Sequence, residues 1–90
     1  MPYISKELRA HLETGAVPNS PGELNYVFTM CINLYLDKHG LSYTKLNEVM
    51  GVLACVQQEV YRRLAVPYED AKIVENGEVF WDFSAKVVDK

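Results

Sequence analysis

One face of a predicted long helix carries residues that suit a binding surface. They have polar or small side chains and follow one another at spacings of three, four, four and three: Glu48, Gly51, Cys55, Glu59 and Arg62. Residues at these spacings share one face of a helix. A glycine within a helix costs about 1 kcal/mol relative to alanine, so Gly51 needs a reason such as the close approach of another group. Two interpretations stay open: packing against a neighbouring subunit, and a wall that faces a ligand.

The end of the same helix carries cations that suit phosphate. Arg62 and Arg63 are followed within ten residues by Tyr68 and Lys72. Guanidinium and ammonium groups bind phosphate oxygens, and a tyrosine ring stacks on a base. A structural interpretation stays open beside this one. Cations near a helix C-terminus are favoured by the helix dipole, and Glu59 with Arg63 has the spacing of a well-oriented ion pair.

A further polar face is predicted on the preceding helix, on the side away from its apolar residues: Asn25, Tyr26, Thr29 and Asn33. Most polar faces of this kind are simply solvated. Tyr26 and Asn33 lie two helical turns apart, however, so that both could serve one interface.

Catalytic and metal-binding signatures are absent from the sequence. It contains no GxSxG motif, phosphate-binding glycine loop, HExxH motif or Cys–His motif. Glu48 and Glu59 lie about 16 Å apart along one helix, which is too far for paired acid–base catalysis. The cysteines and histidines lack the spacing of a zinc site. We therefore predict that the protein is not an enzyme and holds no metal and no cofactor.

Capping residues and apolar spacing predict three helices, over residues 5–14, 20–39 and 42–65. Ser20 and Glu23 have the pattern of a capping box, and Pro21 suits the first helical position. The second helix has a stripe of apolar residues: Leu24, Val27, Phe28, Cys31, Ile32 and Tyr35. The stripe of the third helix is Leu46, Val49, Met50, Leu53, Val60 and Leu64.

These elements predict a mainly α fold. A short turn at Gly40 joins the two long helices, so we expect them to fold back as an antiparallel hairpin. Pro67 is expected to end the third helix. Residues 68–75 then form a short helix that stops at Asn76–Gly77, or Asn76–Gly77 is a β-turn between two strands; we favour the helix. The predicted fold is thus an antiparallel hairpin of two long helices with a short N-terminal helix and a short C-terminal helix or β-turn segment.

Length and composition favour a small domain that associates with itself. The 90 residues are 49% hydrophobic and fit a single helical domain over residues 1–80 with a C-terminal extension over residues 81–90. A domain this small buries a marginal core, which disulfides, a metal or self-association can stabilise. Cys31 and Cys55 lie in helical patterns and are expected to be buried free thiols. Self-association remains, and we favour a homo-oligomer.

Charge and hydropathy exclude two classes of partner. The net charge of −3 argues against a protein that binds nucleic acid through its phosphates. The sequence has no signal peptide, and no apolar run is long enough to cross a membrane. We expect no nucleic-acid partner, no membrane association and a cytoplasmic location.

The ordered motifs of the chain resemble those of a widespread family of small tailed-phage proteins of uncharacterised function. They are Met1–Ile4 (MPYI), Pro21–Tyr26 (PGELNY), Asn47–Gly51 (NEVMG), Glu59–Arg63 (EVYRR), Pro67–Asp70 (PYED) and Glu75–Phe80 (ENGEVF). The extension from Trp81 falls outside the family pattern. The resemblance implies a phage gene expressed in the cytoplasm of a bacterial host.

By analogy with small non-catalytic phage proteins that sequester nucleotide signals, the resemblance also suggests an anti-defence sponge. Such a homo-oligomer would hold a small nucleotide-like immune signal in pockets between subunits. The predicted ligand-binding residues are Asn25, Tyr26, Asn47, Glu48, Glu59, Arg62, Arg63, Tyr68 and Lys72. The alternative is a protein-interaction module, an inhibitor or adaptor that binds a host or phage protein through its acidic, aromatic C-terminal segment.

Overall fold

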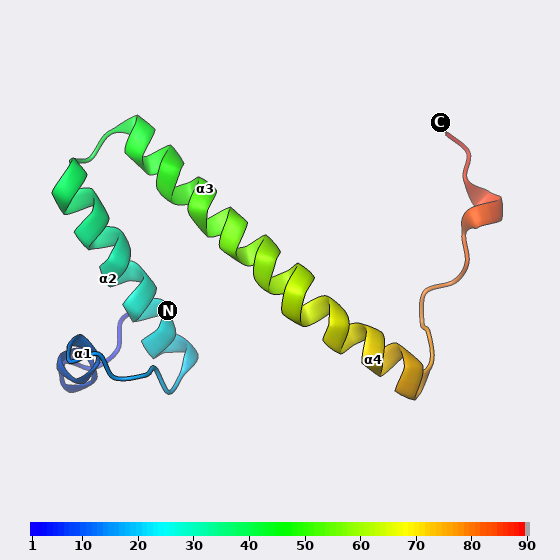
Figure 1. Cartoon of the computed structure of the whole chain (residues 1–90), viewed down its shortest axis with the longest axis horizontal. Coiled ribbons are helices and arrows are strands. Elements are labelled where there is room, and N and C mark those ends of the chain that lie inside the picture. Colours follow the sequence, from blue (N-terminus) through cyan, green and yellow to red (C-terminus); the bar gives the residue numbers. More distant parts are fainter. Residues whose placement is uncertain (90) are drawn as a thin grey trace. The chain divides into compact units, whose positions relative to one another are not determined.

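The computed structural model describes residues 1–89, and these residues form helices and connecting segments without a strand (Figure 1). The mainly α prediction is therefore confirmed. The elements are α1 (Lys6–Glu13), α2 (Pro21–His39), α3 (Tyr43–Val60), a π-helical turn (Tyr61–Ala65), α4 (Val66–Asn76) and a 3-10 turn (Ser84–Lys86). Contacts divide the chain into two units, Met1–Gly51 and Val52–Lys90, which are described in turn.

Serine caps begin the helices of the first unit, as the sequence predicts. The Ser5 hydroxyl accepts a hydrogen bond from the Leu8 N–H at 3.3 Å. The Ser20 hydroxyl accepts one from the Glu23 N–H at 3.1 Å, and Pro21 takes the first position of α2. The Glu23 carboxylate in turn accepts from the Asn19 N–H at 3.3 Å. These bonds satisfy N–H groups that a helix start leaves without partners.

A small core lies where α1 packs against α2. Leu12, Glu23 and Tyr26 are the buried residues of the described chain. The Tyr26 hydroxyl donates to Glu13 Oε1 at 2.9 Å, which links α2 to the end of α1. Burial, followed by this hydrogen bond, raises the pKa of Tyr26. The carboxylate of Glu13 thus satisfies a phenol that α1 removes from water.

The N-terminal segment is fixed to the same core. Arg9 Nε donates to the Ile4 carbonyl at 2.9 Å, and its guanidinium lies 5.7 Å from the centre of the Tyr26 ring. A Cβ at Gly22 would lie 3.2 Å from both Ile4 Cγ2 and the Met1 carbonyl oxygen. Gly22 therefore allows the first residues to approach the start of α2 closely.

Beside the turn between α2 and α3, the two helices meet through side chains. Tyr35 of α2 contacts Lys45 and Glu48 of α3. Gly40, with a φ of 86°, ends α2, and the Ser42 hydroxyl accepts from the Lys45 N–H at 3.1 Å at the start of α3. The packed helix pair of the first unit is α1 with α2. Packing of α2 and α3 along their length, as in the predicted hairpin, is not confirmed.

The prediction that Pro67 ends the third helix is wrong. The chain stays helical from α3 through the turn Tyr61–Ala65 into α4. The Val66 N–H bonds to the Tyr61 carbonyl, five residues earlier, as in a π-helix. Pro67 then occupies the first turn of α4, where a residue without an N–H is tolerated. The π-helical hydrogen bond of Val66 thus keeps the chain helical up to Pro67, which would otherwise interrupt the regular hydrogen bonds of an α-helix.

The segment after Pro67 forms the short helix rather than the strand pair. Helix α4 ends at Asn76, and Gly77 follows with a φ of 92°, its N–H bonding to the Ile73 carbonyl at 2.8 Å. A positive φ of this size favours glycine. Asn76–Gly77 is therefore the end of a helix, and no strand follows it within the described residues.

Most apolar side chains have little cover within the chain. In the second unit no described residue is buried, and only Ala65 and Val66 are half-buried. Met50 is 66% exposed and Leu64 67%, although both belong to the predicted apolar stripe of the third helix. Cys31 and Cys55 are exposed, so the prediction of buried thiols is wrong for the single chain. The apolar stripes have the spacing of amphipathic helices, but the contacts within one chain leave most of their side chains exposed.

Among residues 1–89, no helix has both the length and the apolar character that a membrane span requires.

Replacement of Leu12 by alanine tests the core between α1 and α2. Leu12 is 6% exposed, so Leu12→Ala should lower the free energy of unfolding by about 2–3 kcal/mol. Leu41→Ala is the matched control, because Leu41 is 73% exposed and should change stability by less than about 0.5 kcal/mol. Urea denaturation followed by circular dichroism, at one protein concentration, measures both. Equal losses in the two variants would show that α1 does not build the core.

Candidate functional site

The predicted ligand-binding residues fall in both units of the chain. The first unit holds Asn25, Tyr26, Asn47 and Glu48, and the second holds Glu59, Arg62, Arg63, Tyr68 and Lys72.

Tyr26 is a core residue and Asn25 is a surface residue of α2. Tyr26 is 8% exposed, and its hydroxyl is engaged by Glu13. Asn25 is exposed and accepts the Thr29 hydroxyl at its carbonyl oxygen (2.8 Å) and at Oδ1 (3.2 Å). The sequence pattern predicts that Tyr26 lies on a solvated side of the helix. The prediction is wrong because α1 covers this side, which the pattern of α2 does not reveal.

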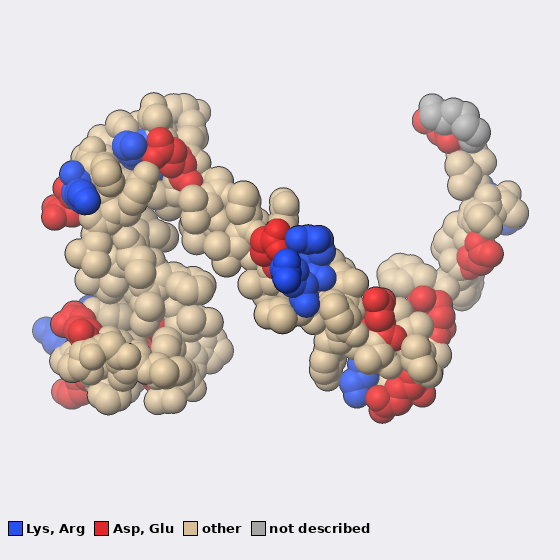
Figure 2. All heavy atoms as spheres, viewed as in Figure 1, with Lys and Arg blue, Asp and Glu red and all other residues tan. Residues whose placement is uncertain are grey.

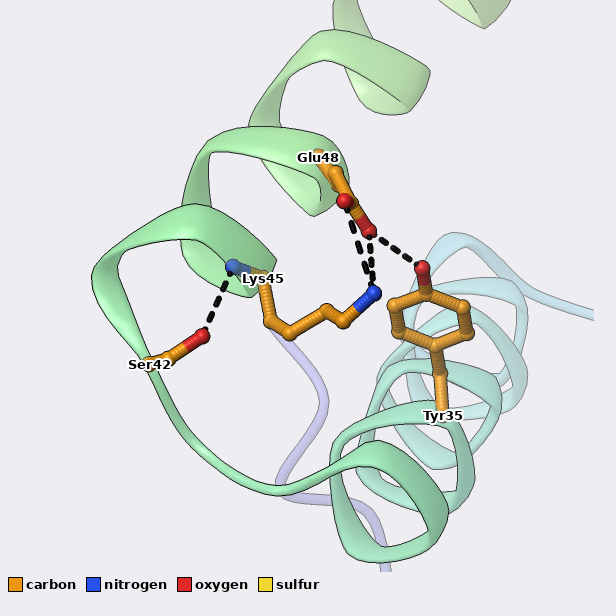
Figure 3. Close-up of polar contacts among 4 residues, drawn as sticks. All are labelled: Tyr35, Ser42, Lys45 and Glu48. Carbon is orange, nitrogen blue, oxygen red and sulfur yellow. Dashed lines mark hydrogen bonds and ion pairs between the residues drawn. The ribbon is translucent and has the colours of Figure 1, made fainter.

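Glu48 of α3 is contacted by two side chains, Tyr35 and Lys45 (Figure 3). The Tyr35 hydroxyl donates to Glu48 Oε1 at 2.6 Å, and Lys45 Nζ lies 3.1 Å from Oε1 and 3.4 Å from Oε2. Lys45 Nζ also lies 5.9 Å from the centre of the Tyr35 ring. The carboxylate thus joins two side chains of different helices. Asn47, next to it in sequence, is exposed.

Sequence reasoning identified Glu48 but missed Tyr35 and Lys45. The spacing of Lys45 and Glu48, three residues on one helix, is a signal that could have found the ion pair. Tyr35 lies thirteen residues from Glu48 on another helix, and no local pattern indicates this contact.

The contacts of Glu48 set its protonation. The hydrogen bond from Tyr35, then that from Lys45, lowers the pKa of the Glu48 carboxyl. The same contact with Glu48 raises the pKa of Tyr35, and the hydrogen bond to Glu48 raises the pKa of Lys45. A carboxylate that is stabilised in its charged form is a weak base. Glu48 therefore suits a structural or ligand-orienting role better than proton transfer.

In the second unit the cations are exposed and two of them are paired with carboxylates. Arg62 Nη2 lies 3.1 Å from both carboxylate oxygens of Glu59, which is the neighbour three residues earlier. Lys72 Nζ lies 3.5 Å from Glu75 Oε2 and 5.8 Å from the centre of the Tyr68 ring. Exposed pairs of this kind contribute about 0–1 kcal/mol, so a phosphate can replace their carboxylates at little cost.

Arg62 lines an open hollow along the helix at the π turn. Figure 2 shows blue spheres gathered between α3 and α4, next to red ones. The hollow has a volume of about 580 Å³ and is lined by Ala54, Gln57, Gln58, Tyr61, Arg62 and Val66. A smaller hollow of about 350 Å³ lies at the end of α4, between Lys72, Ile73 and the segment Glu78–Phe80. Arg62 is the predicted site residue that lines the larger hollow, and Lys72 the one that lines the smaller.

Comparison with known proteins places most of the chain within one family. A family model described as a domain of unknown function (DUF6899) matches residues 1–79. No curated protein and no solved structure matches the chain. The family match thus covers α1 to α4 and leaves the aromatic residues Phe80, Trp81 and Phe83 beyond it.

From the Tyr35–Glu48 contact we predict a lowered titration midpoint for the Glu48 carboxyl. Because its pKa is lowered in the folded chain, the contribution of Glu48 to stability is present above its unfolded pKa and is lost as pH falls through the folded pKa. An NMR titration of the side-chain carboxyl carbon should give a midpoint below the ordinary value of 4.5. Tyr35→Phe should raise that midpoint toward 4.5, and the control Tyr43→Phe, at a tyrosine 80% exposed, should leave it unchanged. An identical midpoint in Tyr35→Phe and the original protein would contradict the assigned cause.

Proposed function

We propose that this chain, which belongs to the DUF6899 family, is a phage-encoded, non-catalytic binding protein that assembles into a homo-oligomer. Pockets between its subunits hold a small nucleotide-like signal of the bacterial immune system and keep it from its receptor. The protein acts in the cytoplasm of the host cell.

Self-association is supported by the lack of a core in the second unit, and this observation carries the proposal. No described residue from Val52 onward is buried, whereas Val60, Tyr61 and Leu64 are 51%, 55% and 67% exposed. Apolar burial contributes about 25 cal/mol per Å² and is the main favourable term in folding. A helical segment of this length without such burial needs a surface to pack on. A second copy of the same chain offers a stripe of the same kind.

Gly51 supports close packing on the face of α3 that carries it. A Cβ at this position would meet no atom of the described residues within 4 Å, so no contact among residues 1–89 requires glycine there. Glycine inside a helix nonetheless costs about 1 kcal/mol relative to alanine. A helix of another subunit that approaches the backbone at Gly51 accounts for this cost.

The ligand is proposed from the chemistry of the exposed cations. Arg62, Arg63 and Lys72 lie on one continuous helical segment, and all three are exposed. Guanidinium forks bind phosphate in bidentate geometry. Tyr68, 66% exposed and already beside Lys72, can stack on a base. In this proposal Asn25, Asn47, Glu48 and Glu59 serve ribose and base edges, while Tyr26 acts from the core that positions α2.

A second candidate function, a protein-interaction module, is favoured by the C-terminal segment. Phe80 and Trp81 are each 81% exposed, and Phe83 is 58% exposed. Residues 78–89 contain the acidic Glu78, Asp82 and Asp89 against one base, Lys86. Exposed aromatic residues of this density mark interaction surfaces in many proteins.

Removal of the arginines tests the ligand. Native mass spectrometry of the protein, mixed with a panel of cyclic and linear nucleotide signals, should show an oligomer that gains one ligand mass per subunit or per interface. Arg62→Ala with Arg63→Ala should weaken that binding by at least about tenfold, since two charge-assisted hydrogen-bond donors are lost. The control Lys38→Ala removes a cation at the end of α2 and should bind as the original protein does.

The alternative function, a protein-interaction module, predicts that the C-terminal aromatic residues are essential and that the arginines are not. If Phe80→Ser with Trp81→Ser abolishes biological activity while the arginine variants keep it, the interaction module replaces the ligand-binding proposal. A chain that remains a monomer and binds no nucleotide in the panel also rejects the proposal.

Replacement of Gly51 by alanine tests the subunit interface. In an isolated helix Gly51→Ala should raise stability by about 1 kcal/mol, because alanine is the better helix former. If another subunit approaches the backbone here, the added methyl group should instead shift the oligomer toward monomer. Sedimentation velocity across a dilution series measures this shift. Tighter or unchanged association in Gly51→Ala would remove Gly51 from the interface.

A further inference from the structure

The π turn Tyr61–Ala65 adds one residue to the helical segment of the second unit. The Val66 N–H bonds to the carbonyl of Tyr61, five residues earlier, where a regular α-helix would use the carbonyl of Arg62. A turn closed in this way holds one residue more than an α-helical turn. Successive residues of an α-helix are about 100° apart around its axis, so the extra residue rotates α4 by about 100° relative to a regular continuation of α3.

Two pairs of residues across the turn show this rotation. Ala54 and Val66 line the same hollow, although they are twelve residues apart. In a regular α-helix this separation would place them about 120° apart around the axis, whereas with the extra residue they are about 20° apart. The Tyr61 hydroxyl lies 3.5 Å from Glu69 Oε1, eight residues later. That separation corresponds to about 80° in a regular helix and to about 20° with the extra residue.

Pro67 accounts for the extra residue. In a regular α-helix through this segment, its ring would clash with the carbonyl of Arg63, four residues earlier, and that carbonyl would lose its N–H partner. After the π turn Pro67 instead stands in the first turn of α4, where no N–H is needed. Residues 58–66 contain no glycine and no serine, the other residues at which helices commonly kink. Pro67 is thus the residue that makes a regular helix unfavourable here.

The rotation decides which side chains of α4 continue the apolar stripe of α3. In a regular helix the face of Val60 would pass to Ala71 and Val74, eleven and fourteen residues later. With the extra residue the same face passes to Tyr68 and Lys72, eight and twelve residues after Val60. Each of these pairs lies within about 40° of Val60 in its own register. The π turn therefore ends the apolar stripe, and an aromatic ring with a cation 5.8 Å from its centre follows instead.

We infer that Pro67 is a positioning residue, which through the π turn sets Tyr68 and Lys72 in line with the apolar stripe of α3. The step from position to binding rests on the proposed function, in which a second subunit covers this stripe and a nucleotide lies between subunits. In line with the stripe, Tyr68 and Lys72 stand at the edge of that contact and can reach the nucleotide. Without the rotation they would lie about 100° away around the helix axis.

Replacement of Pro67 by alanine tests the cause of the π turn. Pro67→Ala should give a regular helix, so that the Val66 N–H bonds to the carbonyl of Arg62. NMR detects this as a scalar coupling across the hydrogen bond, which should move from the carbonyl carbon of Tyr61 to that of Arg62. Pro21→Ala is the matched control, because Pro21 also stands in the first turn of a helix but follows a serine cap. A coupling that stays at Tyr61 in Pro67→Ala would overturn the inference.

A deletion separates the position of α4 from other effects of the substitution. In Pro67→Ala, removal of Ala65 takes one residue out of the regular helix and turns α4 back by about 100°. Tyr68 and Lys72 are then in line with Val60 again. In titrations with each nucleotide of the panel, Pro67→Ala should weaken binding by at least about tenfold, and the added deletion should restore it to within about threefold of the original. The NMR signals of Tyr68 and Lys72 should shift with nucleotide in the original and restored proteins.

The results separate this inference from the proposed function. Unchanged binding in Pro67→Ala, with the coupling moved to Arg62, overturns the positioning role and leaves the proposed function intact. Binding that is lost in Pro67→Ala and is not restored by the deletion of Ala65 overturns it as well. A protein that binds no nucleotide of the panel rejects the proposed function and the positioning role together, while the coupling at Val66 still decides whether Pro67 imposes the π turn. The inference is supported when the coupling moves, binding falls and the deletion restores it.

Discussion

Apolar side chains repeated along helices need to be buried, and among residues 1–89 the contacts of the chain bury them at one place, between α1 and α2. Helix α1 packs on α2 so that Leu12 and Tyr26 are buried, and the N-terminal residues lie close to Gly22. Elsewhere the apolar stripes of α2, α3 and α4 are half or fully exposed. Burial of apolar surface is the main force that stabilises a fold. The small amount of apolar surface buried within one chain is therefore the main constraint on this structure. It is the reason to propose assembly, and it makes each uncovered surface a candidate contact.

Carboxylates organise the polar surface of both units. Glu13 satisfies Tyr26, Glu48 joins Tyr35 to Lys45, and Glu59 holds Arg62. The first contact is tied to a buried phenol, so it belongs to the fold. The last is exposed and weak, so its cation can exchange a carboxylate for the phosphate of a ligand. A contact with a carboxylate therefore has different consequences according to whether its partner is buried or exposed.

The candidate site was predictable from sequence only in part. The sequence predicts Arg62, Arg63 and Lys72 as phosphate-binding candidates from their charge and their position at or just beyond the end of the long helix, and all three are exposed. The sequence did not reveal that Tyr26 is removed from solvent, because this depends on α1. Nor did it reveal the hollow at the π turn. The turn depends on a hydrogen bond from the Val66 N–H to the carbonyl of Tyr61, five residues earlier, and no residue type indicates such a bond.

The sequence by itself determined where most helices begin and end. Ser5, Ser20 and Ser42 cap helix starts, and Gly40 and Gly77 follow helix ends, because a cap depends on neighbours within four residues. Only the tertiary structure decided the burial of Tyr26 and the contact of Tyr35 with Glu48, since both join residues thirteen apart on different helices. Pro67 shows the limit of local rules, because a change in helix geometry at Tyr61–Ala65 overrides its tendency to end a helix. Local chemistry fixed the elements, and contacts between distant residues fixed what those elements expose.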